Sequence, residues 1–324
     1  MRNAAPDAAV DRFRHNVAGL VPAGPGTRFG IAVSGGPDSM ALLLLAAQAF
    51  PGQVEAATVD HGLRAASRDE AAMVAGWCSV RDIRHTILAP DVPITGSIQA
   101  NARAARYALL ENWRAGSGID WLMTAHHADD QLETILMRLN RGSGVSGLAG
   151  VRRHNGTILR PLLGWRKTEL AALALDAGMP VANDPSNGDT RFDRVAMRQH
   201  LADATWLDPV AASRSADALA DAEAALDWTT GELAARHLTR EGDAIILGAT
   251  DFPREIQRRL VLHMLAEAGG QAESPRGDTL DDALLRLAAG HKVSIGNWLL
   301  SGGRQWTLRP APPRRTPSAP AADE

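Results

Sequence analysis

The alternation of short and long apolar segments in the first half of the chain constrains the fold most strongly. Short strand-like runs occur at 29–35, 54–60 and 119–125, and longer segments with helical spacing follow them, for example at 39–50 and 128–140. Such alternation is typical of βαβ units. We therefore predict an α/β fold with a doubly wound, Rossmann-like parallel sheet. The remaining elements expected in this half are helices over 68–81 and 98–115 and a strand over 83–88.

Three polar loops directly follow predicted strands. They are SGGPDS at 34–39, VDHGLR at 59–64 and TAHHADD at 124–130. In doubly wound sheets, ligands bind beyond the carboxyl ends of the strands. We therefore expect the three loops to meet at one edge of the sheet and to form a single site.

The first of these loops joins a predicted strand to a predicted helix and contains both glycines and an acid. Gly35 and Gly36 let backbone N–H groups approach an anion, and a helix N-terminus attracts one. Asp38 in the same turn repels a phosphate unless a cation lies between them. No lysine follows the glycines, so the loop does not match the Walker pattern. An ordinary tight turn at a helix start is the alternative interpretation.

The second half has a different organisation. A helix is expected over 160–178, then a polar segment at 183–194 and an alanine-rich helix over 206–240. A small α+β unit should follow, with a strand at 244–249, helices over 254–268 and 278–289, and a hairpin at 293–310 that turns at Ser301-Gly302-Gly303. We place domain boundaries at 1–205 and 206–311, and expect the Pro/Ala-rich tail 312–324 to be disordered.

Composition excludes several classes of protein. Cys78 is the only cysteine, so an intramolecular disulfide, a CxxC redox pair and a cysteine-ligated zinc site are excluded, and we expect a buried structural thiol. No apolar run is long enough to span a membrane and no signal region begins the chain, so we expect a cytoplasmic protein without a membrane partner. The net charge is −3, but residues 151–200 carry +3 and 201–324 carry −5. If the protein binds nucleic acid, it should do so through a local patch and not through its overall charge.

Several motifs carry a resemblance to known families. SGGPDS resembles the SGGxDS loop of the PP-loop ATP pyrophosphatases, which cleave ATP between the α- and β-phosphates. Five ordered motifs over about 170 residues further resemble the tRNA(Ile)-lysidine synthetase family: VDHGLR, ARAARY, TAHHADDQLETILMRLNRGSGVSGLAG, RPLL and DPSNGDTRFDRVAMR. The resemblance implies an ATP-dependent ligase that adenylates carbon 2 of the wobble cytidine in the CAU-anticodon isoleucine tRNA and releases pyrophosphate. L-lysine then displaces AMP to give lysidine.

The same resemblance implies roles for individual residues. ATP and pyrophosphate are expected at Ser34, Gly35, Gly36, Asp38, Ser39, Val59 and His61, with Mg²⁺ on Asp38. The expected catalytic residues are Asp38, Arg106, His126 and Arg198. Lysine is expected at Asp130 and Glu133, which lie three residues apart and can share one helix face. tRNA is expected at Arg191, Arg194 and Arg198.

Some assignments have alternatives within the motifs. Arg103 is the reserve for Arg106. His126 is preferred over His127, which could equally be a packing residue, and Asp129 could cap the helix. Pro37 stands where some members of the family have lysine. The second half is shorter than in the longest members, and we expect it to dock the anticodon loop through a few arginines, such as Arg254, Arg258 and Arg259.

Other functions share parts of this pattern. tRNA thiolases also attack carbon 2 of a pyrimidine but typically rely on cysteines, whereas NAD, GMP and asparagine synthetases share only the loop. A non-catalytic RNA-binding or nucleotide-sensing protein is the alternative from another class. The oligomeric state stays open, with a homodimer as one alternative.

Overall fold

The computed structural model describes residues 4–60, 66–90, 98–182, 193–202, 204–269 and 277–312. The chain forms two compact units, residues 1–220 and 221–324. The division falls inside α9 (Pro209–His237), so this helix contributes to both units. The predicted end of the catalytic domain at 205 remains a prediction, and the predicted disordered tail lies almost wholly outside the described residues.

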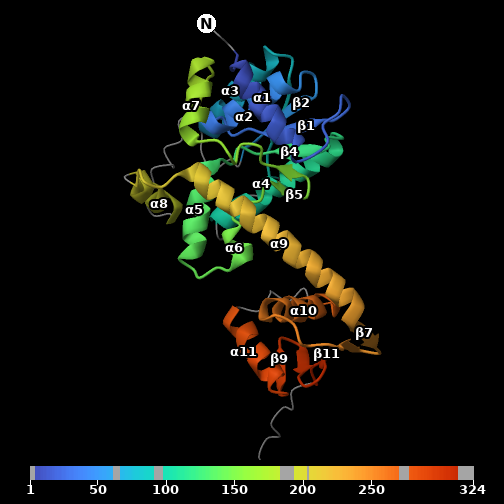
Figure 1. Cartoon of the computed structure of the whole chain (residues 1–324). Helices are drawn as coiled ribbons and strands as arrows, with labels where there is room; N and C mark the ends of the chain where they lie inside the picture. Colours follow the sequence, from blue (N-terminus) through green and yellow to red (C-terminus); the bar gives the residue numbers. More distant parts are fainter. Residues whose placement is uncertain are drawn as a thin grey trace, which may run out of the picture. The chain divides into compact units, whose positions relative to one another are not determined.

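The first unit is built on a six-stranded sheet in the order β3-β2-β1-β4-β6-β5, visible in part in Figure 1. The strands are β1 (Phe29–Ala32), β2 (Val54–Val59), β3 (Arg84–Leu88), β4 (Trp121–Met123), β5 (His154–Asn155) and β6 (Ile158–Leu159). Neighbours pair in parallel except β5, which is antiparallel to β6. The predicted doubly wound sheet is confirmed, while β5 and β6 were not predicted.

Helices cover both faces of this sheet. A large apolar core joins β1 to α1 (Asp7–Ala18), α2 (Pro37–Ala49), α3 (Ala66–Ser79) and α7 (Lys167–Asp176). On the other face, α4 (Ile98–Gly116) packs Leu110 and Trp113 against β2 and β4. A Cβ on Gly30 would lie 2.7 Å from the Trp113 ring, so glycine in β1 permits this close packing. Helix α1 was not predicted.

Helix α2 is apolar around its whole circumference. Its four consecutive leucines, 42–45, are all buried, which is expected of a helix enclosed by protein on every side. Three further helices lie in this unit: α5 (Ala128–Leu139), α6 (Val145–Leu148) and α8 (Asp193–Ala202). Cys78 of α3 is buried as predicted, and burial raises the pKa of its thiol to about 11.

The second unit is a small α+β unit, as predicted. Its antiparallel sheet has the order β7-β8-β11-β10-β9, and α10 (Arg254–Glu267) and α11 (Gly277–Ala288) share its apolar core. The strands are β7 (Leu238–Glu241), β8 (Ala244–Leu247), β9 (Lys292–Ile295), β10 (Trp298–Ser301) and β11 (Trp306–Pro310). The predicted hairpin over 293–310 is a three-stranded meander, and Ser301-Gly302-Gly303 does connect two antiparallel strands. A Cβ on Gly302 would collide with the backbone of Leu287.

No described helix in either unit is long and apolar enough to cross a membrane.

Candidate active site

The loops after β1 and β4 meet the end of β2 at the carboxyl edge of the sheet. They line a cavity of about 130 Å³ together with α4. The sequence-predicted residues found there are Ser34, Ser39, Val59, Arg106 and His126, with Arg103 beside them. The structure thus brings together residues from four separate segments. His61 lies outside the described residues.

The glycine loop is held by its own serines. The Ser39 hydroxyl donates to the Gly36 carbonyl at 3.0 Å and accepts the Ser34 N–H at 3.1 Å. Gly35 has φ of +85°, a conformation that side-chain-bearing residues rarely adopt. Gly36 is the N-cap of α2 and Pro37 is its first residue, so the helix N-terminus points its amides toward the loop. This geometry suits an anion.

Asp38 occupies the first turn of α2 beside this anion-binding geometry. Its Oδ2 lies 3.6 Å from His127 Nε2, whereas its Oδ1 is buried with no hydrogen-bond partner in the part of the chain that the structure describes. A buried carboxylate oxygen left unpaired is costly, so a cation ligand fits this position. Among the described residues no group of three or more His, Cys, Asp or Glu side chains could hold a metal.

The two histidines after β4 have different positions. His126 lines the cavity, and its Nδ1 lies 2.9 Å from the Thr124 hydroxyl. His127 is only 3% exposed and caps α5: its Nδ1 accepts the Asp130 N–H at 3.3 Å, and its own N–H donates to Asp130 Oδ2 at 3.1 Å. This capping box was not predicted, although the spacing His-x-x-Asp is a signal for one.

The environment of His127 is strongly acidic. Burial lowers the pKa of its imidazole, but hydrogen bonding to Asp38 and the charges of Asp130, Asp38 and Asp129 together raise it above the usual value. The neutral tautomer with hydrogen on Nε2 fits the geometry, because Nδ1 accepts a hydrogen bond while Nε2 faces Asp38 and Asp130. His127 therefore links the glycine loop to the start of α5.

Asp130 and Glu133 share one arginine. Arg198 of α8 donates from Nε to Glu133 Oε1 at 2.6 Å and from Nη2 to Asp130 Oδ1 at 3.2 Å. Glu133 is 4% exposed, and this burial raises its pKa although Arg198 opposes the shift. Residues predicted for lysine and for RNA thus form one cluster. Arg191 and the side chain of Arg194 lie outside the described residues.

Arg103 and Arg106 both border the cavity from α4. Arg103 lies over the Tyr107 ring, 5.1 Å from its centroid. Burial by the surrounding protein lowers the pKa of Arg106, although part of the residue remains exposed. The charge of Arg103 lowers this pKa further, whereas Tyr107 raises it. The ordinary pKa of arginine is so high that the guanidinium stays charged.

The alternative that Asp129 caps α5 is wrong. His127 is the cap, and Asp129 Oδ2 instead accepts the N–H of Lys167 at 2.8 Å, at the first residue of α7.

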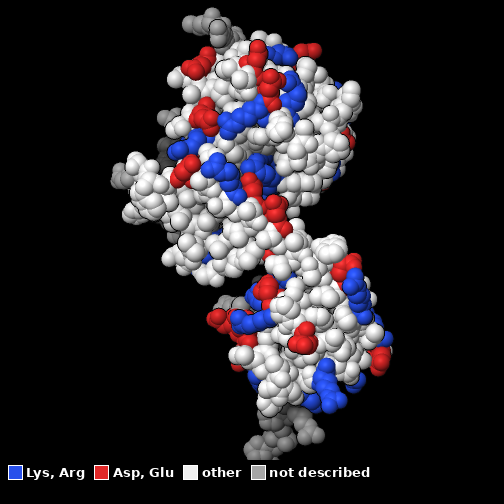
Figure 2. Space-filling view, viewed as in Figure 1, with Lys and Arg blue, Asp and Glu red and all other residues white. Residues whose placement is uncertain are grey.

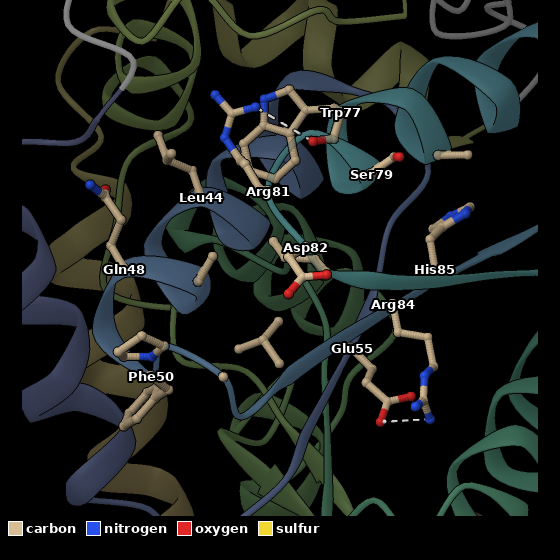
Figure 3. A pocket seen from close by; sticks show the side chains of 16 residues that line it. Leu44, Gln48, Phe50, Glu55, Trp77, Ser79, Arg81, Asp82, Arg84 and His85 are labelled. Atoms are coloured by element: carbon tan, nitrogen blue, oxygen red, sulfur yellow. Dashed lines mark hydrogen bonds and ion pairs between the residues drawn. The ribbon is translucent and has the colours of Figure 1, made fainter.

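A larger cavity of about 830 Å³ lies at the opposite, amino-terminal ends of β2 and β3 (Figure 3). Arg81 stacks on Trp77 there, and Glu55 lies 3.7 Å from Arg84. It contains none of the predicted site residues. We place the site at the carboxyl ends instead, because the loop, the histidines and the acid pair converge there.

The arginines expected to dock RNA in the second unit are largely engaged. Arg259 is 11% exposed and pairs with Glu223, Asp227 and Glu255, so its contact with RNA stays a prediction that would require these pairs to open. Arg254 and Arg258 lie 3.0 and 3.8 Å from Asp281 and remain accessible. On the face shown in Figure 2, acidic and basic side chains are interspersed over this unit.

Comparisons with known proteins identify the family of the chain. A family model described as a PP-loop domain matches residues 10–205. The chain is 41% identical over 327 residues to a tRNA(Ile)-lysidine synthase of Novosphingobium aromaticivorans, covering 96% of this chain and 97% of that protein. It is 39% identical to a second one from Zymomonas mobilis, covering 94% of each.

Among solved structures, the U34-tRNA thiolase from Methanococcus maripaludis superposes with a TM-score of 0.53 at 16% identity, covering 66% of this chain and 80% of that one. This likeness supports the fold alone. The two sequence relatives match over nearly their full lengths, and the PP-loop match contains the whole candidate site. The chain therefore belongs to the tRNA(Ile)-lysidine synthase family.

Proposed function

We propose that this protein ligates L-lysine to carbon 2 of the wobble cytidine in the CAU-anticodon isoleucine tRNA, using ATP. The observation that carries the proposal is a continuous series of charged groups between the glycine loop and the acid pair. Asp38, His127 and Asp130 follow one another at 3.6 and 3.5 Å, and Arg198 then joins Asp130 to Glu133. A phosphate site and an ammonium site thus adjoin, as a two-step ligation requires.

In the first step, cytidine O2 attacks the α-phosphorus of ATP, the bond to the β-phosphate breaks, and pyrophosphate leaves. The loop of Ser34, Gly35, Gly36 and Ser39 and the N-terminus of α2 hold the pyrophosphate. Mg²⁺ on Asp38 would neutralise charge on these phosphates. Arg106 stabilises negative charge that develops on the α-phosphate, and His126 binds a phosphate oxygen from the same cavity.

Recognition of the two nucleotide substrates uses neighbouring segments. Val59, the last residue of β2, and His61 border the adenine. Arg191, Arg194 and Arg198 contact the RNA backbone, which suits the basic charge of residues 151–200. ATP, lysine and tRNA all occur in the cytoplasm, and we place the protein there.

In the second step, the ε-amine of lysine forms a bond to carbon 2. The bond between carbon 2 and the adenylated oxygen breaks, AMP leaves with that oxygen, and the amine loses a proton. Asp130 and Glu133 hold the ammonium and take up the proton. The raised pKa of Glu133 suits a proton acceptor better than that of an exposed carboxylate.

The decisive experiment is mass spectrometry of the isoleucine tRNA after incubation with ATP and isotopically labelled lysine. We expect label in the wobble nucleoside and tRNA-dependent exchange between ATP and pyrophosphate. Binding of tRNA without either product would favour the non-catalytic RNA-binding alternative. A mass change equal to the replacement of one oxygen by one sulfur would indicate thiolation instead.

A further inference from the structure

A third cavity lies next to the acid pair, between α5, α8, the start of α7 and the segment before α9. Its volume is about 380 Å³, within the range of about 300–1000 Å³ that small-molecule sites occupy. All of its lining residues belong to the first unit. We name it the α5–α8 pocket.

The walls of the α5–α8 pocket combine an apolar stretch with charges of both signs. Leu132, Leu201 and Leu207 supply apolar surface. The charged lining residues are Asp129, Glu133, Arg166, Lys167 and Arg198. A free amino acid with a long aliphatic side chain matches this pattern, because methylenes favour apolar walls while its two ammonium groups and its carboxylate need partners of opposite charge.

The acidic side of the pocket determines which end of such a ligand lies nearest the glycine loop. Glu133 lines the pocket and is linked through Arg198 and Asp130 to His127 and the glycine loop. An amine that reacts near the loop must therefore approach along Glu133. The α-carboxylate of the same molecule then lies at the far side of the pocket.

Two cations line the pocket where α7 begins. Arg166 is the N-cap of α7 and Lys167 is its first residue. The Nε of Arg166 is buried without a hydrogen-bond partner among the described residues. Its Nη1 lies 3.9 Å from Asp208 Oδ1, which is too far for a hydrogen bond. The backbone N–H of Lys167 is held by Asp129, which fixes the position from which its exposed side chain reaches the pocket.

We propose that Arg166 and Lys167 bind the α-carboxylate of the lysine substrate in the α5–α8 pocket, an inference that rests on the proposed function. Asp129 then faces the α-ammonium group, and the apolar wall contacts the methylenes. This subsite makes the enzyme selective for the free amino acid over diamines of the same length.

The test is a competition between L-lysine and cadaverine, which has the same chain and both amines but no carboxylate. The full-length protein receives both with ATP and the isoleucine tRNA, and mass spectrometry resolves the two nucleoside products. The product ratio reports relative kcat/KM and does not depend on how much enzyme is folded. We expect wild type to favour lysine, and Arg166→Met and Lys167→Met each to reduce the ratio about 3- to 10-fold.

The chain provides a matched control, because Lys292 is its only other lysine and lies exposed in β9 of the second unit. Lys292→Met should leave the ratio unchanged. If Arg166→Met does not fold, Lys167→Met at an exposed position decides the matter. Equal use of the two amines by wild type, or an unchanged product ratio in both pocket variants, would refute the carboxylate subsite. Formation of lysidine in the same assay would still support the proposed function. A wild type that forms neither product would refute the function itself.

Discussion

Replacing Arg198 by methionine should destabilise the first unit in a pH-dependent way. The change removes the guanidinium that pairs with Glu133 at 2.6 Å and Asp130 at 3.2 Å, and leaves a carboxylate that is only 4% exposed without a cation. Breaking a buried pair by deleting one partner costs about 3–5 kcal/mol. Because Arg198 itself is 34% exposed, we reduce this to about 2 kcal/mol at pH 8. The expected loss in Tm is about 4–8 °C.

The sign of the pH dependence follows from Glu133. Burial already raises its pKa, and losing Arg198 raises it further, so the folded state binds a proton more readily than the unfolded state. Such a group favours the folded state below its unfolded pKa, and this contribution is lost as pH rises through the folded pKa. The variant should therefore be closer to wild type at pH 5 than at pH 8.

Differential scanning calorimetry at both pH values checks this. The double variant Arg198→Met/Glu133→Gln should recover much of the loss at pH 8, because no buried charge remains unpaired at residue 133. An equal Tm loss at both pH values, together with a double variant no more stable than the single one, would refute the reasoning.

Three further predictions concern the reaction. Asp38→Ala should abolish tRNA-dependent ATP–pyrophosphate exchange with little change in Tm; near-parental exchange would remove Asp38 from the phosphate or metal site. Glu133→Gln should weaken the use of lysine about thirtyfold, corresponding to about 2 kcal/mol, while adenylation of the RNA persists; equal loss of both steps would assign the acid pair a structural role. A chain ending at Ala220 should bind ATP but modify tRNA poorly, as calorimetry and modification assays would show; full-rate modification would contradict the docking role of the second unit. The cut is placed after Ala220 and not at the predicted boundary after residue 205, because Ser213 donates a hydrogen bond to the Leu163 carbonyl and Asp217 accepts one from Arg153.

The sequence predicted those features that depend on local pattern. The strands β1 to β4 followed from apolar runs, and the meeting of the loops after β1 and β4 followed from the rule for parallel sheets. Strand β6 was missed because two residues, Ile158 and Leu159, give no measurable periodicity. Helix α1 was missed although Val10, Phe13 and Val17 have helical spacing and are buried.

Partners distant in the chain could not be predicted. Arg198 contacts Glu133, 65 residues earlier, and Arg259 contacts Glu223, 36 residues earlier. Both arginines were expected to contact RNA. The sequence could not show how exposed either side chain is, because exposure depends on tertiary packing. Only Arg259 proved to be enclosed by carboxylates from α9 and α10.

The enclosure of α2 determines which parts of the site can adapt to substrates. The helix that carries Asp38 is surrounded by α1, α7 and the sheet, so its N-terminus offers a rigid, prearranged cradle for the nucleotide. Induced fit on this side would require the central core to repack, which is costly. Adjustment to lysine and RNA therefore falls to α8, which reaches the site through Arg198. The side of the site formed by α2 is therefore rigid, whereas the side formed by α8 adjusts when the substrates bind.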